Sequence, residues 1–199
     1  GTEKQQICLS YAYGDGKESS CENTVNSVQR LFYNIPINTY FSLDLDGIAA
    51  LNDSIGGVDV VSPETIGDFV EGQSYHLVGQ QAESFVRTRD TSKVDSNNMR
   101  MQRQKVYIQS FMNTVIQQTK KDLTTPLDLF NASAPYSCTN LNPSKVTYLA
   151  QQAVLGGMNG IDMLSVPGQV KMGSKYAEFN VSEAEFYQMF LSIYYTKIE

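Results

Sequence analysis

The sequence predicts an α/β fold, an α+β sandwich in which a central mixed β-sheet is flanked by helices on both sides. Stretches with strand-like alternation and stretches with helical periodicity follow one another along the chain, which favours this class. Hydrophobic residues make up 41% and charged residues 18% of the 199 residues, as in a globular protein with a substantial core. The sequence contains no internal repeat and no low-complexity linker, so we expect residues 1–199 to form a single domain.

The first third of the chain reads as alternating strands and helices. Residues 6–11 (QICLSY) resemble a strand that leads into a turn, and Ser20 is a candidate cap for the helix that follows. This helix must end before Ile35-Pro36, because proline disfavours helical geometry in the preceding residue. We expect a strand over residues 39–45, a short helix over 47–54, and a turn at Gly56-Gly57 into a strand over 58–61.

The rest of the chain continues the alternation. Residues 63–79 are polar and predict a long surface loop, followed by a helical turn and a strand over 84–89. Residues 98–118 have apolar side chains at i, i+3, i+4, i+7 and i+8, which predicts a long amphipathic helix. Asn142-Pro143 should open another helix, and Ser182 with Glu185 forms a capping box for the last one.

The net charge and the cysteine content exclude some classes of function. A net charge of -6 and a pI near 4.8 argue against nucleic-acid binding, which needs an extended basic surface. The three cysteines and one histidine fit no zinc-site spacing. A Cys8–Cys21 disulfide is one alternative and buried free thiols are the other. No apolar run approaches the roughly 18–20 residues of a membrane helix.

One short window concentrates the guanidinium groups. Residues 84–104, SFVRTRDTSKVDSNNMRMQRQ, contain four of the five arginines in this acidic chain. On a strand, Arg87 and Arg89 would share one face. On the following helix, Arg100 and Gln104 are one turn apart, whereas Arg103 is expected to point away from the apolar stripe.

Guanidinium groups near a helix N-terminus suit phosphate oxygens, which they bind bidentately. A pyrophosphate would offset the mutual repulsion of the cations. The alternative is a solvated network of surface ion pairs with no ligand, worth about 0–1 kcal/mol per exposed pair. From the residues alone, both interpretations stay open.

Five segments, in order, resemble the LytR-CpsA-Psr (LCP) family of Gram-positive cell-envelope proteins, also named cell envelope-related transcriptional attenuators. They are YAYG at 11–14; IPI at 35–37 with YFSLD at 40–44 and Gly47; IGGVDV at 55–60; LVG at 77–79 with SFVRTR at 84–89; and Asp95, Arg100, Arg103 and Gln104, which are similar to D-x-G-R-x-x-R-Q. Met99 stands where the family usually has glycine.

The resemblance implies an extracytoplasmic domain on an N-terminal membrane anchor, facing the membrane surface. It implies transfer of a glycopolymer, such as wall teichoic acid or capsule, from a polyprenyl-pyrophosphate carrier to peptidoglycan, with magnesium assisting. It also implies that the first strands of the domain, which carry the magnesium-binding aspartates, and the anchor are absent from this chain. No metal ligand is therefore expected within it.

Carried over by position, the resemblance assigns the arginine window to the pyrophosphate. Arg87 and Arg100 would be catalytic, and Arg87, Arg89, Arg100 and Gln104 would bind the pyrophosphate, with Arg103 as a further candidate. A non-catalytic polyprenyl-phosphate-binding or sensory protein is the alternative. Transcriptional attenuation through DNA is disfavoured by the acidic pI.

Overall fold

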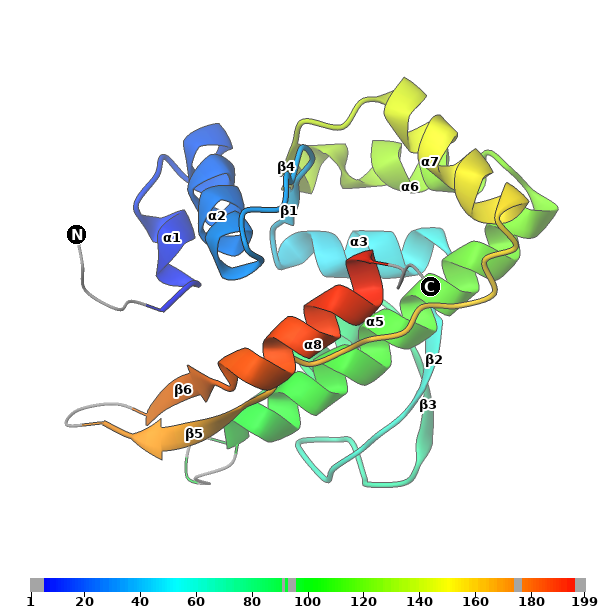
Figure 1. The fold of residues 1–199 in the computed structure, drawn as a ribbon. Coiled ribbons are helices and arrows are strands. Elements are labelled where there is room, and N and C mark those ends of the chain that lie inside the picture. Colours follow the sequence, from blue (N-terminus) through cyan, green and yellow to red (C-terminus); the bar gives the residue numbers. More distant parts are fainter. Residues whose placement is uncertain (1–5, 91, 93–95, 174–176, 196–199) are drawn as a thin grey trace. The chain divides into compact units, whose positions relative to one another are not determined.

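The computed structural model describes residues 6–90, 92, 96–173 and 177–195. The chain divides into two compact units, Gly1–Asp162 and Met163–Glu199 (Figure 1). The expectation of a single domain over residues 1–199 stays a prediction.

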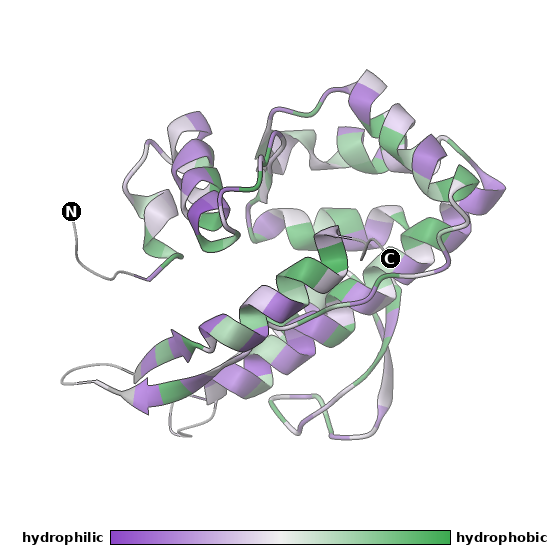
Figure 2. Ribbon diagram, viewed as in Figure 1, coloured by the Kyte–Doolittle hydropathy of each residue, from purple (hydrophilic) through white to green (hydrophobic). Residues whose placement is uncertain are grey.

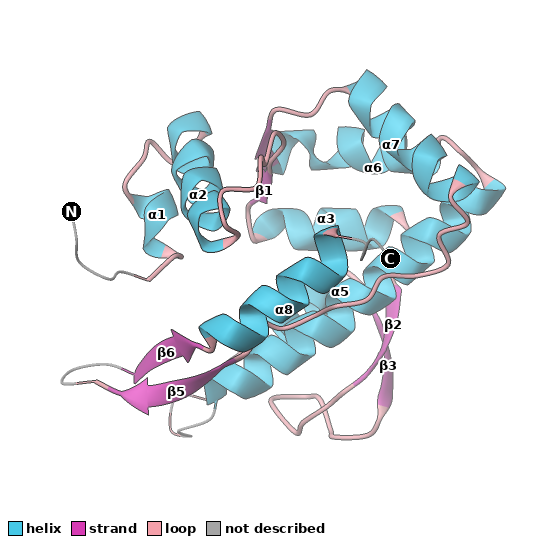
Figure 3. Cartoon of the chain, viewed as in Figure 1, coloured by secondary structure: helices cyan, strands magenta, loops and turns pink. Residues whose placement is uncertain are grey.

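The first unit is predominantly helical (Figure 3). Its elements, in chain order, are α1 (Leu9–Ala12), α2 (Glu18–Leu31), β1 (Phe41–Leu43), α3 (Asp46–Ser54), β2 (Val58–Val61), β3 (Ser74–Leu77), α4 (Gln80–Arg87), α5 (Ser96–Lys121), α6 (Thr125–Ser133), the 3₁₀ turn η1 (Ala134–Tyr136), β4 (Ser137–Thr139) and α7 (Pro143–Leu155). The second unit comprises β5 (Gly168–Met172), β6 (Ala177–Val181) and α8 (Glu183–Tyr194).

The strands of the described residues form three two-stranded antiparallel ladders, β1–β4, β2–β3 and β5–β6. The α/β class is confirmed, but a central mixed sheet is not what these strands build. The physical reason is that two predicted strands are helical. Residues 6–11 run into α1, and residues 84–89 lie largely in α4.

The apolar core lies between α3, the β2–β3 ladder, α4 and α5. Its buried members are Ile55, Val58, Val60, Phe69, Leu77, Ala82, Phe85, Val86 and Tyr107. The ring of Phe69 packs edge-on against Phe85, with centroids 5.1 Å apart. Figure 2 shows hydrophobic and hydrophilic bands along α5, as expected for a helix with one face on this core.

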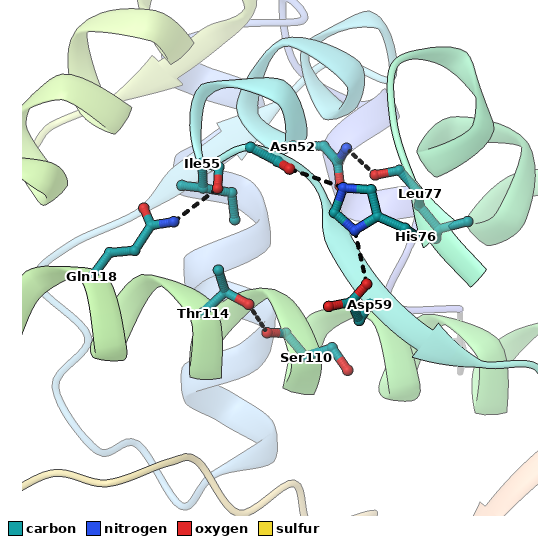
Figure 4. Close-up of polar contacts among 9 residues, drawn as sticks. Asn52, Ile55, Asp59, His76, Leu77, Ser110, Thr114 and Gln118 are labelled. Atoms are coloured by element: carbon teal, nitrogen blue, oxygen red, sulfur yellow. Dashed lines mark hydrogen bonds and ion pairs between the residues drawn. The ribbon is translucent and has the colours of Figure 1, made fainter. Parts of the chain in front are cut away.

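Polar bridges join these elements at their edges (Figure 4). Asn52 of α3 is fully buried, donates to the carbonyl of Leu77 at 2.8 Å and accepts from the Tyr107 hydroxyl at 3.2 Å. Gln118 of α5 donates to the carbonyl of Ile55 at 2.8 Å. A buried amide without partners would be costly, so these bonds fix α3 and the following turn against β3 and α5.

The glycine turn between α3 and β2 is confirmed. Gly56 and Gly57 have φ angles of 80° and 92°, a region that side chains with a Cβ rarely adopt. A Cβ on Gly57 would lie 2.5 Å from Nε2 of His76. The turn therefore needs glycine at this position both for its backbone angle and for the close approach of β3.

Several predicted boundaries are confirmed. Helix α2 ends at Leu31, ahead of Pro36, although it begins at Glu18 rather than after Ser20. The side chain of Asn142 accepts from the backbone N–H of Lys145 and caps α7 as expected. Helix α8 begins after Ser182, but the serine side chain makes no capping bond there.

Other helices and strands were not predicted from the sequence pattern. Strand β3 occupies part of the predicted loop over 63–79, because Tyr75 and Leu77 face inward while their neighbours are exposed. Helix α6 and the β5–β6 hairpin were not predicted from the sequence. Among the described residues, no helix combines the length and the apolar character that crossing a bilayer requires.

Of the two alternatives for the cysteines, the Cys8–Cys21 disulfide is not formed. Cys8, Cys21 and Cys138 are free thiols, and Cys8 is exposed whereas Cys21 is buried. The neighbour of Cys21 is Cys138, brought close because α2 contacts β4. Burial, together with this second thiol, raises the pKa of Cys21 to about 11.

Candidate functional site: the arginine cluster

The arginine cluster, defined as Arg87, Arg89, Arg100, Arg103 and Gln104, lies where α4 passes into α5. Helix α4 is oriented by its apolar side, with Ala82, Phe85 and Val86 buried. These positions repeat at i, i+3 and i+4, which is helical spacing. Arg87 and Arg89 are therefore not alternate residues of a strand. Arg87 ends the helix, and Arg89 belongs to the loop after it.

Arg87 is exposed at the end of α4. Its Nη1 lies 2.7 Å from Oε1 of Glu83, one turn back along α4. The Arg87 side chain is 63% exposed, whereas that of Glu83 is 11% exposed. An exposed pair of this kind is worth about 0–1 kcal/mol, so an anionic ligand could displace it.

Arg89 is held across the connection to α5. Its Nε donates to Oγ of Ser96, the first residue of that helix, at 3.0 Å. The motif residue Asp95, which precedes Ser96, lies outside the described residues. The bond to Ser96 fixes the base of the Arg89 side chain near the N-terminus of α5, where backbone N–H groups favour anions.

Arg100 is partly buried on the first turns of α5. Its Nη2 donates to Oδ1 of Asn97 at 3.0 Å, and its Nε is buried without a hydrogen-bond partner among the described residues. A buried N–H donor without an acceptor is uncommon in native proteins and often marks a functional position. Arg100 therefore has a donor available for a further acceptor.

Arg103 differs from the prediction, because its side chain is fully buried rather than directed away from the core. Its Nη2 donates to the carbonyl of Thr88, and its Nε lies 2.8 Å from Oε1 of Glu64. The N–H of Nε does not point at that oxygen, so the contact is an ion pair without a directed hydrogen bond. The prediction was wrong because the apolar stripe was taken from residues 108–116. Nearer its N-terminus, α5 packs against α4 and the β2–β3 connection.

Gln104 also contacts α4 rather than open solvent. Its Nε2 donates to the carbonyl of Val86 at 3.1 Å. Together, Arg103 and Gln104 hold the backbone on both sides of Arg87 through the carbonyls of Val86 and Thr88. The structure thus gives these two residues contacts that position the neighbouring arginines.

Glu64 is a residue of this region that the sequence did not reveal. It lies in the connection between β2 and β3, which was predicted to be a surface loop, yet it is only 9% exposed. Burial lowers the pKa of the Arg103 guanidinium, Glu64 opposes this effect, and the like charge of Arg100 adds to it. Arg103 still stays charged, because the ordinary pKa of arginine is far above neutrality.

The cluster consists mainly of groups that can bind anions. Three guanidinium groups reach the α4–α5 junction from backbone segments that are tied to one another, and such groups neutralise phosphate charge. No group of three or more His, Cys, Asp or Glu side chains suited to a metal occurs among the residues described above.

Comparisons with known proteins place the chain in a family. The model of the LytR_cpsA_psr family matches residues 1–192. A Bacillus cereus protein named polyisoprenyl-teichoic acid–peptidoglycan teichoic acid transferase TagU is 28% identical over 173 residues, covering 83% of this chain and 52% of its own. A Bacillus anthracis protein of the same name is 35% identical over 91 residues, covering 44% of this chain and 28% of its own.

A solved structure described as TagT bound to LI-WTA superposes with a TM-score of 0.70 at 16% identity, covering 97% of this chain and 71% of that one. The fold of the chain is therefore that of LCP proteins. At most, the chain spans about half the length of the curated relatives it matches. The family match over residues 1–192 shows that the chain belongs to the LytR_cpsA_psr family.

Proposed function

We propose that the protein is a phosphotransferase that ligates a cell-envelope glycopolymer to peptidoglycan. Its donor substrate would be a polyprenyl-pyrophosphate-linked glycopolymer, such as wall teichoic acid or capsule. Family membership supports this role, as do the printed names of the relatives, which describe teichoic acid transfer to peptidoglycan. Its place of action would be the extracytoplasmic face of the membrane in a Gram-positive envelope.

The observation that carries the proposal is the tie between α4 and α5. Arg103 and Gln104 bind the backbone on both sides of Arg87, so Arg87, Arg89 and Arg100 are held at one junction. Cations fixed in this way need little reorganisation when negative charge develops, which is the main source of electrostatic catalysis.

In the proposed reaction, a hydroxyl oxygen of peptidoglycan forms a bond to the phosphorus that carries the glycopolymer. The bond from this phosphorus to the bridging oxygen breaks, the lipid phosphate leaves with the electron pair, and the hydroxyl proton passes to this phosphate or to water. Arg87 and Arg100 would stabilise the charge that grows on the departing phosphate, while Arg89 would orient the diphosphate. Phosphoryl transfer depends mainly on such positioning and charge stabilisation. Magnesium, if bound by another part of the intact protein, would add charge neutralisation.

The test measures transfer of a lipid-linked polymer to peptidoglycan by the intact protein and its variants. We expect Arg87→Ala and Arg100→Ala each to lower the transfer rate by about 10²–10³-fold, as for loss of one preorganised donor. Arg30→Ala is the matched control, because Arg30 is exposed on α2, away from the cluster. Normal transfer by both cluster variants would refute the assignment.

The same protein preparations distinguish the ligase from a binding protein. Binding of farnesyl pyrophosphate that is lost in Arg100→Ala, without any transfer by the wild type, would favour the non-catalytic alternative. Transfer by the wild type, lost in the same variant, would favour the ligase.

A further inference from the structure

The β2–β3 connection presents a carboxylate to the interior from a well-fixed backbone. Oγ of Ser62 donates to the carbonyl of Glu64 at 2.7 Å, and the carbonyl of Ser62 accepts from the N–H of Gly72 at 2.8 Å. Ser62 is itself buried. The Glu64 backbone is therefore anchored independently of the arginine that its side chain meets.

On the other side of the pair, one arginine joins three segments of the chain. Arg103 belongs to α5, lies against Glu64 of the β2–β3 connection, and donates to the carbonyl of Thr88 between the two motif arginines. A guanidinium presents its donors in a rigid plane, so fixing one edge of the plane also fixes the other. The position of the Glu64 carboxylate thus sets where Arg103 holds Thr88.

We propose that Glu64 is a positioning residue for pyrophosphate binding, which acts through Arg103 to fix Thr88 and the flanking Arg87 and Arg89 relative to Arg100. This inference rests on the proposed function, because it assigns Glu64 a role at the same site. Glu64 itself would not touch the ligand.

The energetics of the pair favour this role over a purely stabilising one. Buried ion pairs often stabilise a fold no better than apolar side chains of similar volume, because both charges lose their hydration. The Glu64–Arg103 pair also leaves Nη1 of Arg103 buried without a hydrogen-bond partner in the structure. Compared with a pair of apolar side chains, such an arrangement adds little to stability, but it gives the Thr88 backbone a defined position.

The Glu64 carboxylate also affects the electrostatic repulsion between Arg103 and Arg100. Burial lowers the pKa of Arg103, and the like charge of Arg100 lowers it further. The opposite charge of Glu64 offsets this repulsion.

The test compares farnesyl pyrophosphate affinity with thermal stability in the full chain, by calorimetric titration and thermal unfolding. We expect Glu64→Gln to weaken binding about 10–100-fold, the range found for outer partners of bound ions. Glu64→Asp keeps the charge but is one methylene shorter, and it should lie between Glu64→Gln and the wild type. A ³¹P spectrum of the bound diphosphate should shift in both variants.

Asn52→Ala is the matched control for lost stability. It removes a buried polar bridge from the same core but does not touch the arginine cluster. We expect it to lower the melting temperature and to leave the affinity and the ³¹P shift unchanged. A loss of affinity in Asn52→Ala as large as in Glu64→Gln would overturn the inference, because stability alone would then explain both.

The remaining outcomes separate this inference from the proposed function. If the wild type binds farnesyl pyrophosphate and Arg100→Ala does not, but Glu64→Asp and Glu64→Gln bind like the wild type, the positioning role is refuted and the function stands. If the wild type fails to bind, both are refuted. If Glu64→Gln does not fold, the Glu64→Asp variant provides the test. Wild-type affinity of Glu64→Asp for farnesyl pyrophosphate would then refute the positioning role.

Discussion

At the residue scale, the arginine window contains side chains with opposite environments. Arg87 is largely exposed and bonded to one carboxylate of its own helix, whereas Arg103 is fully buried between Glu64 and the carbonyl of Thr88. Neighbouring positions in one motif thus divide into an exposed group and a buried group that holds the backbone.

Removal of the buried arginine should be far more damaging than removal of an exposed one. Arg103→Met leaves Glu64 buried without its cation and Thr88 without its donor, and should lower the free energy of unfolding by about 3–5 kcal/mol. Arg30→Met, at an exposed position on α2, should change it by less than about 0.5 kcal/mol. Urea denaturation measures both. Equal stability of the two variants would contradict the assigned burial.

The sequence could identify the members of the cluster but not their partners. Motif spacing singled out Arg87, Arg89, Arg100 and Gln104, because their order along the chain follows the family pattern. Nothing local to Glu64 marks it as buried, since its partner is distant in sequence and its surroundings are polar. Pairings of this kind depend on tertiary packing, which single-sequence periodicity does not contain.

At the scale of elements, the main difference between sequence and structure lies at α4. Residues 84–89 were predicted to form a strand, yet Ala82, Phe85 and Val86 form a helical face that packs in the core. The periodicity of a short apolar segment does not distinguish a strand from a helix, so tertiary packing determines which of the two forms. Long helices such as α5 were predicted well, because many turns repeat the same pattern.

The α3–β2 turn should tolerate a side chain at one glycine better than at the next. Gly56→Ala meets only the backbone strain of a positive φ, since nothing lies within 4 Å of the added Cβ. Gly57→Ala meets the same strain and also His76 and the Leu77 carbonyl. We expect Gly56→Ala to cost about 1 kcal/mol and Gly57→Ala about 1–3 kcal/mol more, by thermal unfolding. A smaller cost at Gly57 would contradict the packing of β3.

The β2–β3 ladder contains a pH-dependent contact at His76. Its Nδ1 lies 2.7 Å from Oδ1 of Asp59 and its Nε2 lies 3.0 Å from the carbonyl of Gly56 (Figure 4). The hydrogen bond to Asp59 raises the pKa of His76, while desolvation opposes it. Only the charged imidazole can donate at both nitrogens.

The raised pKa of His76 makes its contribution to stability depend on pH. Because the folded-state pKa lies above the unfolded value of about 6.5, the stabilisation is fully present below that pH. It is lost as the pH rises through the folded-state pKa. We expect the stability difference between the wild type and His76→Gln to be larger at pH 5.5 than at pH 8.5, measured by urea denaturation. A difference that does not change with pH would show that His76 contributes no charged contact.

At the scale of the whole molecule, composition and motif order were the informative signals. They gave the α/β class and the family, both of which are confirmed. They did not give the sheet, because three short antiparallel ladders have weaker patterns than one long sheet. A net charge of -6 with four clustered arginines is an arrangement that favours a small, densely charged ligand over an extended polyanion.

The most direct measurement is a crystal structure of the protein bound to farnesyl pyrophosphate. The account predicts diphosphate oxygens within hydrogen-bonding distance of Arg87, Arg89 and Arg100, with Arg103 still against Thr88. Arg87 would exchange its contact with Glu83 for the ligand. A diphosphate bound elsewhere, with Arg87 still on Glu83 and Arg100 still on Asn97, would contradict it.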